Sequence, residues 1–92
     1  MKSHTTAGFR KLLAALPNDV QRQARSAYRR FVDNPRHPSL RFKQIAGSER
    51  LVAVRISRDY RAVGVRGRSD EIVWFWAGHH QEYEELLKQG DR

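Results

Sequence analysis

The stretch LVAVRISRDYRAVGVRGRSDEIVWFWAGHH, residues 51–80, decides the fold of this chain. It holds three runs rich in valine, isoleucine and aromatic residues, at 51–57, 60–65 and 71–77, and such runs are typical of strands. Only short polar connections separate the runs, so neighbouring strands are expected to pair in the antiparallel sense. Gly78 is expected to break the last strand. The stretch therefore predicts an antiparallel sheet at the centre of the protein.

The first hairpin of this sheet predicts a pair of facing arginines. With the turn at residues 57–59 and Arg58 at its centre, Arg55 falls opposite Arg61 on the neighbouring strand. Directly opposed side chains share one face of a sheet, and two like charges there repel each other. An anion such as a phosphate between them would remove the repulsion. Two other arrangements stay open: one arginine caps an acidic neighbour, or the register is shifted by one residue.

The alternation along the first of these strands assigns its two faces. The even-numbered positions point into a core beneath the helices: Val52, Val54 and Ile56. The odd-numbered positions share the open face: Leu51, Ala53 and Arg55. Arg55 is therefore expected on a surface that a ligand can reach.

A rigid connector with two prolines, residues 35–39, leads into a segment that we expect to be extended, residues 40–45. Lys43 alternates there with Leu40 and Phe42 and is placed to add a cation to the rim of the open face. Arg41 has the same parity and fits the same position equally well. For both residues, a solvated charge on an edge strand is the favoured interpretation.

Two helices are predicted before this connector. The first carries one apolar stripe at helical spacing, begins at Thr5 or Thr6 and stops at Pro17; the stripe is Phe9, Leu12, Leu13 and Leu16. The second begins with Asn18 or Asp19 as its cap and is closed by the Asn-Pro pair at 34–35. Its own stripe is Val20, Ala24, Ala27, Tyr28 and Phe31. Together they form a helical hairpin.

The segment GHHQEY at 78–83 is the most reactive-looking part of the chain. A helix is expected at 80–89, so His80 and Tyr83 share one helical face and form a plausible acid–base pair. For His79 a helix-capping role is favoured over a catalytic one. A metal site is not expected, because adjacent residues diverge on a helix and no third ligand is evident nearby.

Trp74 and Trp76 lie two residues apart and are expected on one face of the last strand. Such aromatic alternation can form a platform on which bases stack. Core packing is the favoured interpretation, because a small domain needs the apolar area of both rings. The arginines of the second helix, Arg22, Arg25, Arg29 and Arg30, are consistent with a solvated face.

The length and composition limit the number of domains and the kinds of site that the chain can form. With 92 residues, the chain has room for one domain, residues 1–92, and one modest core. The absence of cysteine excludes disulfides, thiolate nucleophiles and cysteine-based metal sites. No membrane span or signal peptide is evident, so a cytoplasmic location without membrane contact is expected.

Charge is distributed unevenly. The chain carries 18 lysines and arginines against 10 acidic residues, a net charge of +8. Residues 1–68 contain 16 basic and 4 acidic side chains, whereas residues 69–92 contain 2 and 6. Arginine favours bidentate contacts with phosphate, so a polyanion is the expected partner. A generally soluble basic surface would give the same count.

The order of these elements predicts an α+β fold: a helical hairpin packed on about four antiparallel strands, with a short C-terminal helix. A short N-terminal strand is a further possibility.

The runs PSLRFKQI, LVAVRISRDYRAVG and IVWFWAGHHQEYEELL, in this order, resemble the RelE/ParE toxin superfamily across nearly the whole chain. The resemblance implies a compact RelE-like toxin with a curved sheet.

In the ribonuclease branch of that superfamily, the concave face of the sheet binds messenger RNA in the ribosomal decoding site. Cleavage there needs no metal or other cofactor: the ribose 2′-OH attacks the adjacent phosphate. By resemblance, the catalytic residues are His80, Tyr83, Arg61 and Arg55. The residues expected to bind RNA phosphates are Lys43, Arg41, Arg58 and His79. The general base stays unassigned, because the lysine pair of one ribonuclease branch is reduced here to Lys43 with Arg41.

The resemblance also implies partners and competing functions. Its toxins are restrained by an antitoxin, expected here to be acidic and partly disordered, and the complex of both proteins binds operator DNA. Alternatively, the chain is a DNA gyrase inhibitor like the ParE branch, which lacks the catalytic histidine and tyrosine. A third interpretation is a non-catalytic nucleic-acid-binding module. His80 and Tyr83 favour the messenger RNA endoribonuclease, which would inhibit translation.

Overall fold

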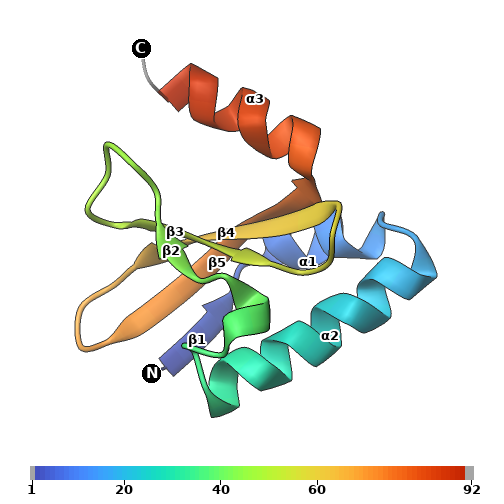
Figure 1. Ribbon diagram of the computed structural model, residues 1–92, viewed down its shortest axis with the longest axis horizontal. Helices are drawn as coiled ribbons and strands as arrows, with labels where there is room; N and C mark the ends of the chain where they lie inside the picture. The colour runs from blue at the N-terminus through green and yellow to red at the C-terminus, as the bar shows by residue number, and fades with distance from the viewer. Residues whose placement is uncertain (1, 91–92) are drawn as a thin grey trace.

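The computed structural model describes residues 2–90 and shows an α+β fold, as the sequence predicts (Figure 1). Its elements are, in order, β1 (Lys2–Thr5), α1 (Ala7–Ala14), α2 (Asn18–Asp33), the 3₁₀ helix η1 (Pro38–Leu40), β2 (Lys43–Gln44), β3 (Leu51–Arg55), β4 (Tyr60–Arg66), β5 (Glu71–His79) and α3 (His80–Gly90). Within the described residues, no helix has the length and apolar character needed to cross a lipid bilayer.

The sheet has five strands in the order β1-β5-β4-β3-β2. Its last four strands pair antiparallel, as expected from their short connections. The N-terminal strand is present as well, and β1 pairs with β5 in the parallel sense. A parallel pair needs a long connection, and both helices and three strands lie between these two elements. The sheet is therefore mixed.

Two apolar clusters lie on opposite faces of the sheet. The larger one is covered by α1 and α2 and contains Phe9, Phe31, Val52, Val54 and Trp74 among others, with Ile56 packed against it. The smaller one is covered by α3 and contains Ile45, Ala53, Val63 and Tyr83. The predicted faces of β3 are thus confirmed. The face that was expected to be open is partly covered, since α3 lies over it (Figure 1).

The starts of the two N-terminal helices differ. Thr6 caps α1, because its side-chain oxygen accepts a hydrogen bond from the Phe9 N–H at 3.0 Å. The predicted cap of α2 by Asn18 or Asp19 is wrong: the helix begins at Asn18 itself, after Pro17, without a side-chain cap. Pro17 occupies the N-cap position itself and has no side-chain oxygen that could accept a hydrogen bond from the first turn.

Residues 40–45 form less strand than expected. Leu40 ends η1 and is buried, and Arg41 follows in the left-handed region with a φ of 47°. Strand β2 is therefore confined to Lys43 and Gln44, which pair with Ala53 and Val52. The two prolines of the connector favour the tight turn over an extended chain.

A β-bulge in β5 reverses the alternation of its side chains. Val63 pairs with Trp76 but Gly64 pairs with Trp74, so Phe75 is an extra residue and is 37% exposed. Trp74 consequently packs under the helices, whereas Trp76 packs against the cluster beneath α3. The prediction that both indoles share one face is wrong for this reason. Both are packed against apolar clusters, as expected.

Strand β5 continues past Gly78, so the predicted break there is wrong. Gly78 pairs with Arg61 and stays within the strand. A Cβ atom at this position would lie 2.8 Å from the Trp76 ring. The glycine is therefore needed for the close approach of the indole and does not end the strand.

Candidate functional site

Arg55 and Arg61 occupy directly paired positions on β3 and β4, as the sequence predicts. Neither alternative arrangement holds, because the register is unshifted and Arg61 forms no hydrogen bond with an acidic side chain within the described residues. Its Nη1 instead donates to the carbonyl oxygens of Ser57, Arg58 and Tyr60, at 2.8, 3.2 and 3.0 Å. Arg61 therefore holds the β3–β4 turn with one nitrogen and leaves the rest of its guanidinium on the sheet face.

Several charged side chains surround the guanidinium of Arg61. Burial lowers the pKa of Arg61, and the charge of Arg55 lowers this pKa further, followed by a smaller effect of Arg41. The phenol of Tyr83 and the carboxylate of Asp59 act in the opposite direction. Three arginines thus converge at the end of the sheet near α3. Such a convergence has an electrostatic penalty that a bound anion would relieve.

Lys43 and Arg58 border this face. Lys43 pairs with Ala53, which places it on the same side of the sheet as Arg55, and its side chain is exposed. Arg58 is exposed in the β3–β4 turn. We call the residues Arg41, Lys43, Arg55, Arg58 and Arg61 the basic face.

Tyr83 lies between α3 and the sheet. It is only 6% exposed, and its ring packs against Trp76 with ring centroids 6.4 Å apart. Its hydroxyl oxygen is buried without a hydrogen-bond partner. Burial raises the pKa of the phenol, and the positive charge of Arg61 partly offsets this rise. The side chain is therefore a neutral proton donor that points into the protein.

His80 begins α3, and its backbone N–H donates to the carbonyl oxygen of Asp59 at 2.7 Å. Its ring stacks against that of His79, with centroids 4.5 Å apart. The predicted pair of His80 and Tyr83 shares helix α3, but the two rings contact different residues. His80 contacts His79, and Tyr83 contacts Trp76. His80 is half-buried at the edge of the sheet, whereas Tyr83 is buried on the side of α3 that packs on the sheet.

His79 has the capping role that the sequence favours. Its Nδ1 accepts a hydrogen bond from the Gln81 N–H at 3.2 Å, in the first turn of α3. Its ring also makes an edge-to-face contact with Tyr60, the residue with which it pairs across the strands.

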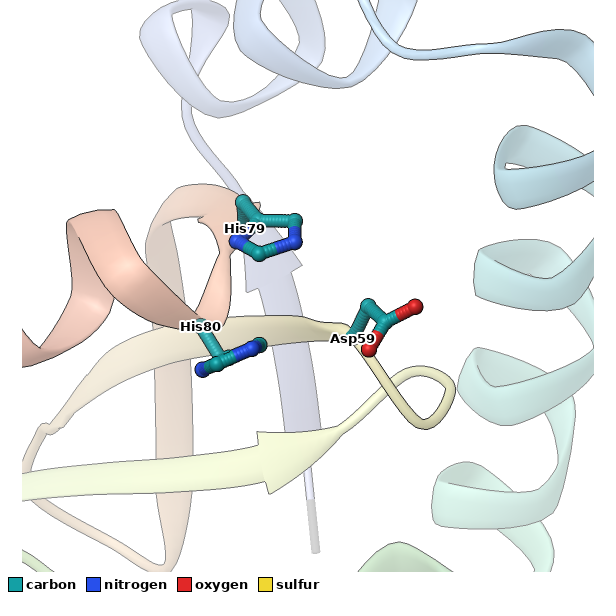
Figure 2. Close-up of side chains that lie close together, drawn as sticks. All are labelled: Asp59, His79 and His80. Carbon is teal, nitrogen blue, oxygen red and sulfur yellow. The ribbon is translucent and has the colours of Figure 1, made fainter.

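The two histidines also lie beside a carboxylate. One potential ligand atom each from Asp59, His79 and His80 lies within 4.8 Å of the others, and Figure 2 shows the three side chains gathered where β5 passes into α3. Both reasons against a metal site were wrong. His79 belongs to β5, so the rings do not diverge as on a helix, and Asp59 offers a third potential ligand atom. The pairing of Tyr60 with His79 brings Asp59 beside His80. This proximity could be predicted from the sequence only if the position of the bulge were known.

An apolar groove of about 350 Å³ lies on the other side of the sheet, between α1, α2 and the strands. Phe9, Leu13 and Ile56 are among its apolar lining residues, and Arg10, Arg25 and Arg29 also line it. The groove has no titratable pair of the kind found at the end of the sheet near α3. Apolar side chains and three arginines therefore meet on this surface.

Comparison with known protein families and structures agrees with this fold. Residues 18–85 match the model of the ParE-like toxin domain. No curated protein sequence matches the chain.

Several solved structures are similar. The RelB–RelE antitoxin–toxin complex from Methanococcus jannaschii contains a chain with a TM-score of 0.72 and 15% identity, covering 90% of this chain and 96% of that one. The YoeB/ParE toxin from Agrobacterium tumefaciens has a TM-score of 0.66 and 14% identity, and the match covers 87% of this chain and 99% of that one. The isolated RelE toxin of E. coli has a TM-score of 0.65 and 16% identity, and the match covers 96% of each chain. At these identities the likeness shows a shared fold.

Proposed function

Since this chain belongs to the family of ParE-like toxin domains, we propose that it is an endoribonuclease toxin that cleaves messenger RNA on the ribosome and so inhibits translation. The observation that supports this most is the direct pairing of Arg55 with Arg61, beside Arg41, on one face of the sheet. Like charges at paired positions destabilise a sheet, so their juxtaposition fits a face built for an anionic ligand. A phosphodiester is such a ligand.

The reaction needs three contributions from the protein. The 2′-oxygen of a ribose bonds to the adjacent phosphorus while the bond to the 5′-oxygen of the next nucleotide breaks, which leaves a 2′,3′-cyclic phosphate and a 5′-hydroxyl. A base must accept the 2′-OH proton, and an acid must protonate the leaving oxygen. Negative charge grows on the phosphoryl oxygens meanwhile, and Arg55 and Arg61 would stabilise it.

His80 is the proposed acid or base, because its imidazole is half-exposed beside the basic face. Tyr83 suits the role of acid only, since burial raises its pKa and keeps the phenol protonated. Tyr83 lies on the side of α3 that packs on the sheet, so its participation requires α3 to move when RNA binds. Lys43, Arg41, Arg58 and His79 would contact phosphates farther along the strand.

We also propose an antitoxin partner for this toxin. The apolar groove between α1, α2 and the sheet carries three arginines on its lining, so it suits an acidic chain with apolar anchors that becomes ordered on binding. Similar toxins from M. jannaschii and Pyrococcus horikoshii were solved as complexes with RelB. Operator DNA would then be bound by the complex of both proteins.

One observation favours the alternative of DNA gyrase inhibition. The matching family is named for ParE-like toxins, and α2 lies within the matched region. This helix exposes Arg22, Arg25, Arg29 and Arg30. In a gyrase inhibitor these residues would matter and His80 would be dispensable. A non-catalytic nucleic-acid-binding module would need the basic face alone.

Primer extension on messenger RNA after brief induction separates these functions. The ribonuclease should produce new discrete 5′ ends inside translated regions, and His80→Ala should abolish them. His4→Ala is the matched control, because His4 is an exposed histidine on β1, far along the chain from the site. Growth arrest without new 5′ ends but with DNA damage signalling would assign gyrase inhibition. Absence of arrest would assign the non-catalytic module.

A further inference from the structure

We propose that Asp59, His79 and His80 bind one divalent transition-metal ion of the zinc class. The three side chains come from the β3–β4 turn, the end of β5 and the start of α3, and one ligand atom of each lies within 4.8 Å of the other two (Figure 2). This site is separate from the apolar groove and borders the basic face.

The donor set selects the kind of metal. Two imidazoles and one carboxylate are ligands for Zn²⁺, Co²⁺, Ni²⁺ or Cu²⁺, and three protein ligands leave a further position for water or another ligand. Mg²⁺ and Ca²⁺ prefer a shell of oxygen atoms, which this cluster does not offer. The site should therefore discriminate between these two groups of ions.

The backbone holds the three ligands in place before any ion binds. Tyr60 pairs with His79 across β4 and β5, and the His80 N–H donates to the Asp59 carbonyl oxygen at 2.7 Å. In a tetrahedral zinc site the ligand atoms lie about 3.3 Å apart, so the side chains must approach by about 1.5 Å at most. The Asp59 side chain is exposed and therefore free of packing that would oppose such a movement.

Two of the three ligands are available without breaking a hydrogen bond or ion pair. Across residues 2–88, no hydrogen bond or ion pair engages the carboxylate of Asp59, and no hydrogen bond engages the ring of His80. Asp59 is also the one acidic residue between positions 50 and 69, amid six arginines. Its carboxylate offsets part of the repulsion that these cations exert on a metal ion.

His79 must give up its capping hydrogen bond. An ion on Nδ1 would use the lone pair that now accepts from the Gln81 N–H, at 3.2 Å. An ion on Nε2 would require the proton to sit on Nδ1, which then cannot accept. Metal binding and the first-turn cap of α3 therefore exclude each other.

Calorimetric titration of the untagged full chain with ZnCl₂ tests the site, with the visible absorption of bound Co²⁺ as evidence for nitrogen ligation. We expect one-to-one binding, and no binding of MgCl₂. Asp59→Asn, His79→Asn and His80→Asn should each weaken zinc binding by about tenfold or more, since even groups that only orient a ligand contribute that much. The asparagine at position 79 can still accept from the Gln81 N–H and so preserves the helix start.

Two controls keep the result specific. Asp33→Asn removes the same charge from an exposed position of α2, and His4→Gln removes another exposed histidine, so both should bind zinc like the wild type. Circular dichroism verifies that every variant is folded. Absence of one-to-one binding, or equal affinity in wild type and all three site variants, would overturn the proposal.

Discussion

Arg55 and Arg61 face each other across β3 and β4 but are held differently. Arg61 donates from Nη1 to three carbonyl oxygens of the β3–β4 turn. Within residues 2–88, no hydrogen bond engages the guanidinium of Arg55. The two cations therefore have separable roles: Arg61 stabilises the turn as well as the anion site, whereas Arg55 is free to serve the ligand alone.

Replacement of each arginine by glutamine should accordingly affect stability differently. Arg55→Gln removes a like-charge repulsion and should leave the free energy of unfolding unchanged or raise it by up to ~0.5 kcal/mol. Arg61→Gln frees carbonyl groups of the turn and should lower that free energy by about 1–2 kcal/mol. Urea denaturation followed by tryptophan fluorescence measures both. Equal losses in the two variants would contradict the assigned roles.

The same two variants should weaken binding to single-stranded RNA. Each removes one cation from the basic face, so the slope of log K against log salt concentration should become shallower by about 0.7 for each phosphate that is no longer neutralised. Fluorescence anisotropy with a labelled RNA oligonucleotide at several salt concentrations gives this slope. Lys11→Gln, on the exposed surface of α1, is the control and should keep the wild-type slope. A wild-type slope in Arg55→Gln would remove that residue from the RNA-binding surface.

Gly64 tests the packing at the bulge of β5. A Cβ atom there would lie 2.8 Å from both the Ile72 Cγ2 and the Trp74 ring, which are buried under the helices. Gly64→Ala should therefore lower the free energy of unfolding by about 1–3 kcal/mol. Gly8→Ala is the matched control, since its Cβ meets only the Thr6 Oγ1 at 3.8 Å and a helical alanine should stabilise by about 0.5–1 kcal/mol. Similar shifts of both urea midpoints in the same direction would be inconsistent with this packing.

Tyr83 should make stability depend on pH in the alkaline range. Burial raises its pKa in the folded state above the ordinary value of 10.0. The unfolded chain therefore loses the phenol proton first, so stability that is present below pH 10 declines as the pH rises from there toward the folded-state pKa. Unfolding of wild type and Tyr83→Phe by urea, compared between pH 8 and pH 11, isolates this effect. The stability of wild type relative to the variant should fall over that range, and a constant difference would contradict the burial of the phenol.

The sequence predicted most of the fold because its determinants are local. The turn at residues 57–59 fixes the register of the first hairpin, so the pairing of Arg55 with Arg61 followed directly. The capping of α1 by Thr6 likewise depends on residues within one helical turn. The family resemblance was confirmed by the match over residues 18–85. For the hairpin register and the helix cap, a few neighbouring residues contain the whole physical cause.

The errors arose where distant residues decide the structure. The extra residue Phe75 reverses the alternation of β5, and that reversal depends on the fit of Trp74 against Gly64 across the sheet. The position of Asp59 beside His79 and His80 depends on the same register. The roles of the predicted site residues stay predictions, because the arrangement of His80 and Tyr83 around RNA follows from a partner that the sequence does not contain.

Zinc should inhibit RNA cleavage if both proposals hold, because one imidazole of His80 cannot ligate a metal and transfer a proton at once. Ribosome-dependent cleavage in a purified translation system should fall on addition of ZnCl₂ and return when a chelator removes the ion. Asp59→Asn is the matched control: it should cleave without added zinc like the wild type and need about tenfold more zinc for equal inhibition. Equal sensitivity of both proteins would place the inhibition elsewhere, for example on the ribosome. If zinc binds at the three residues in calorimetry but leaves cleavage unchanged, His80 has no part in the catalytic step. The metal-site proposal would still hold.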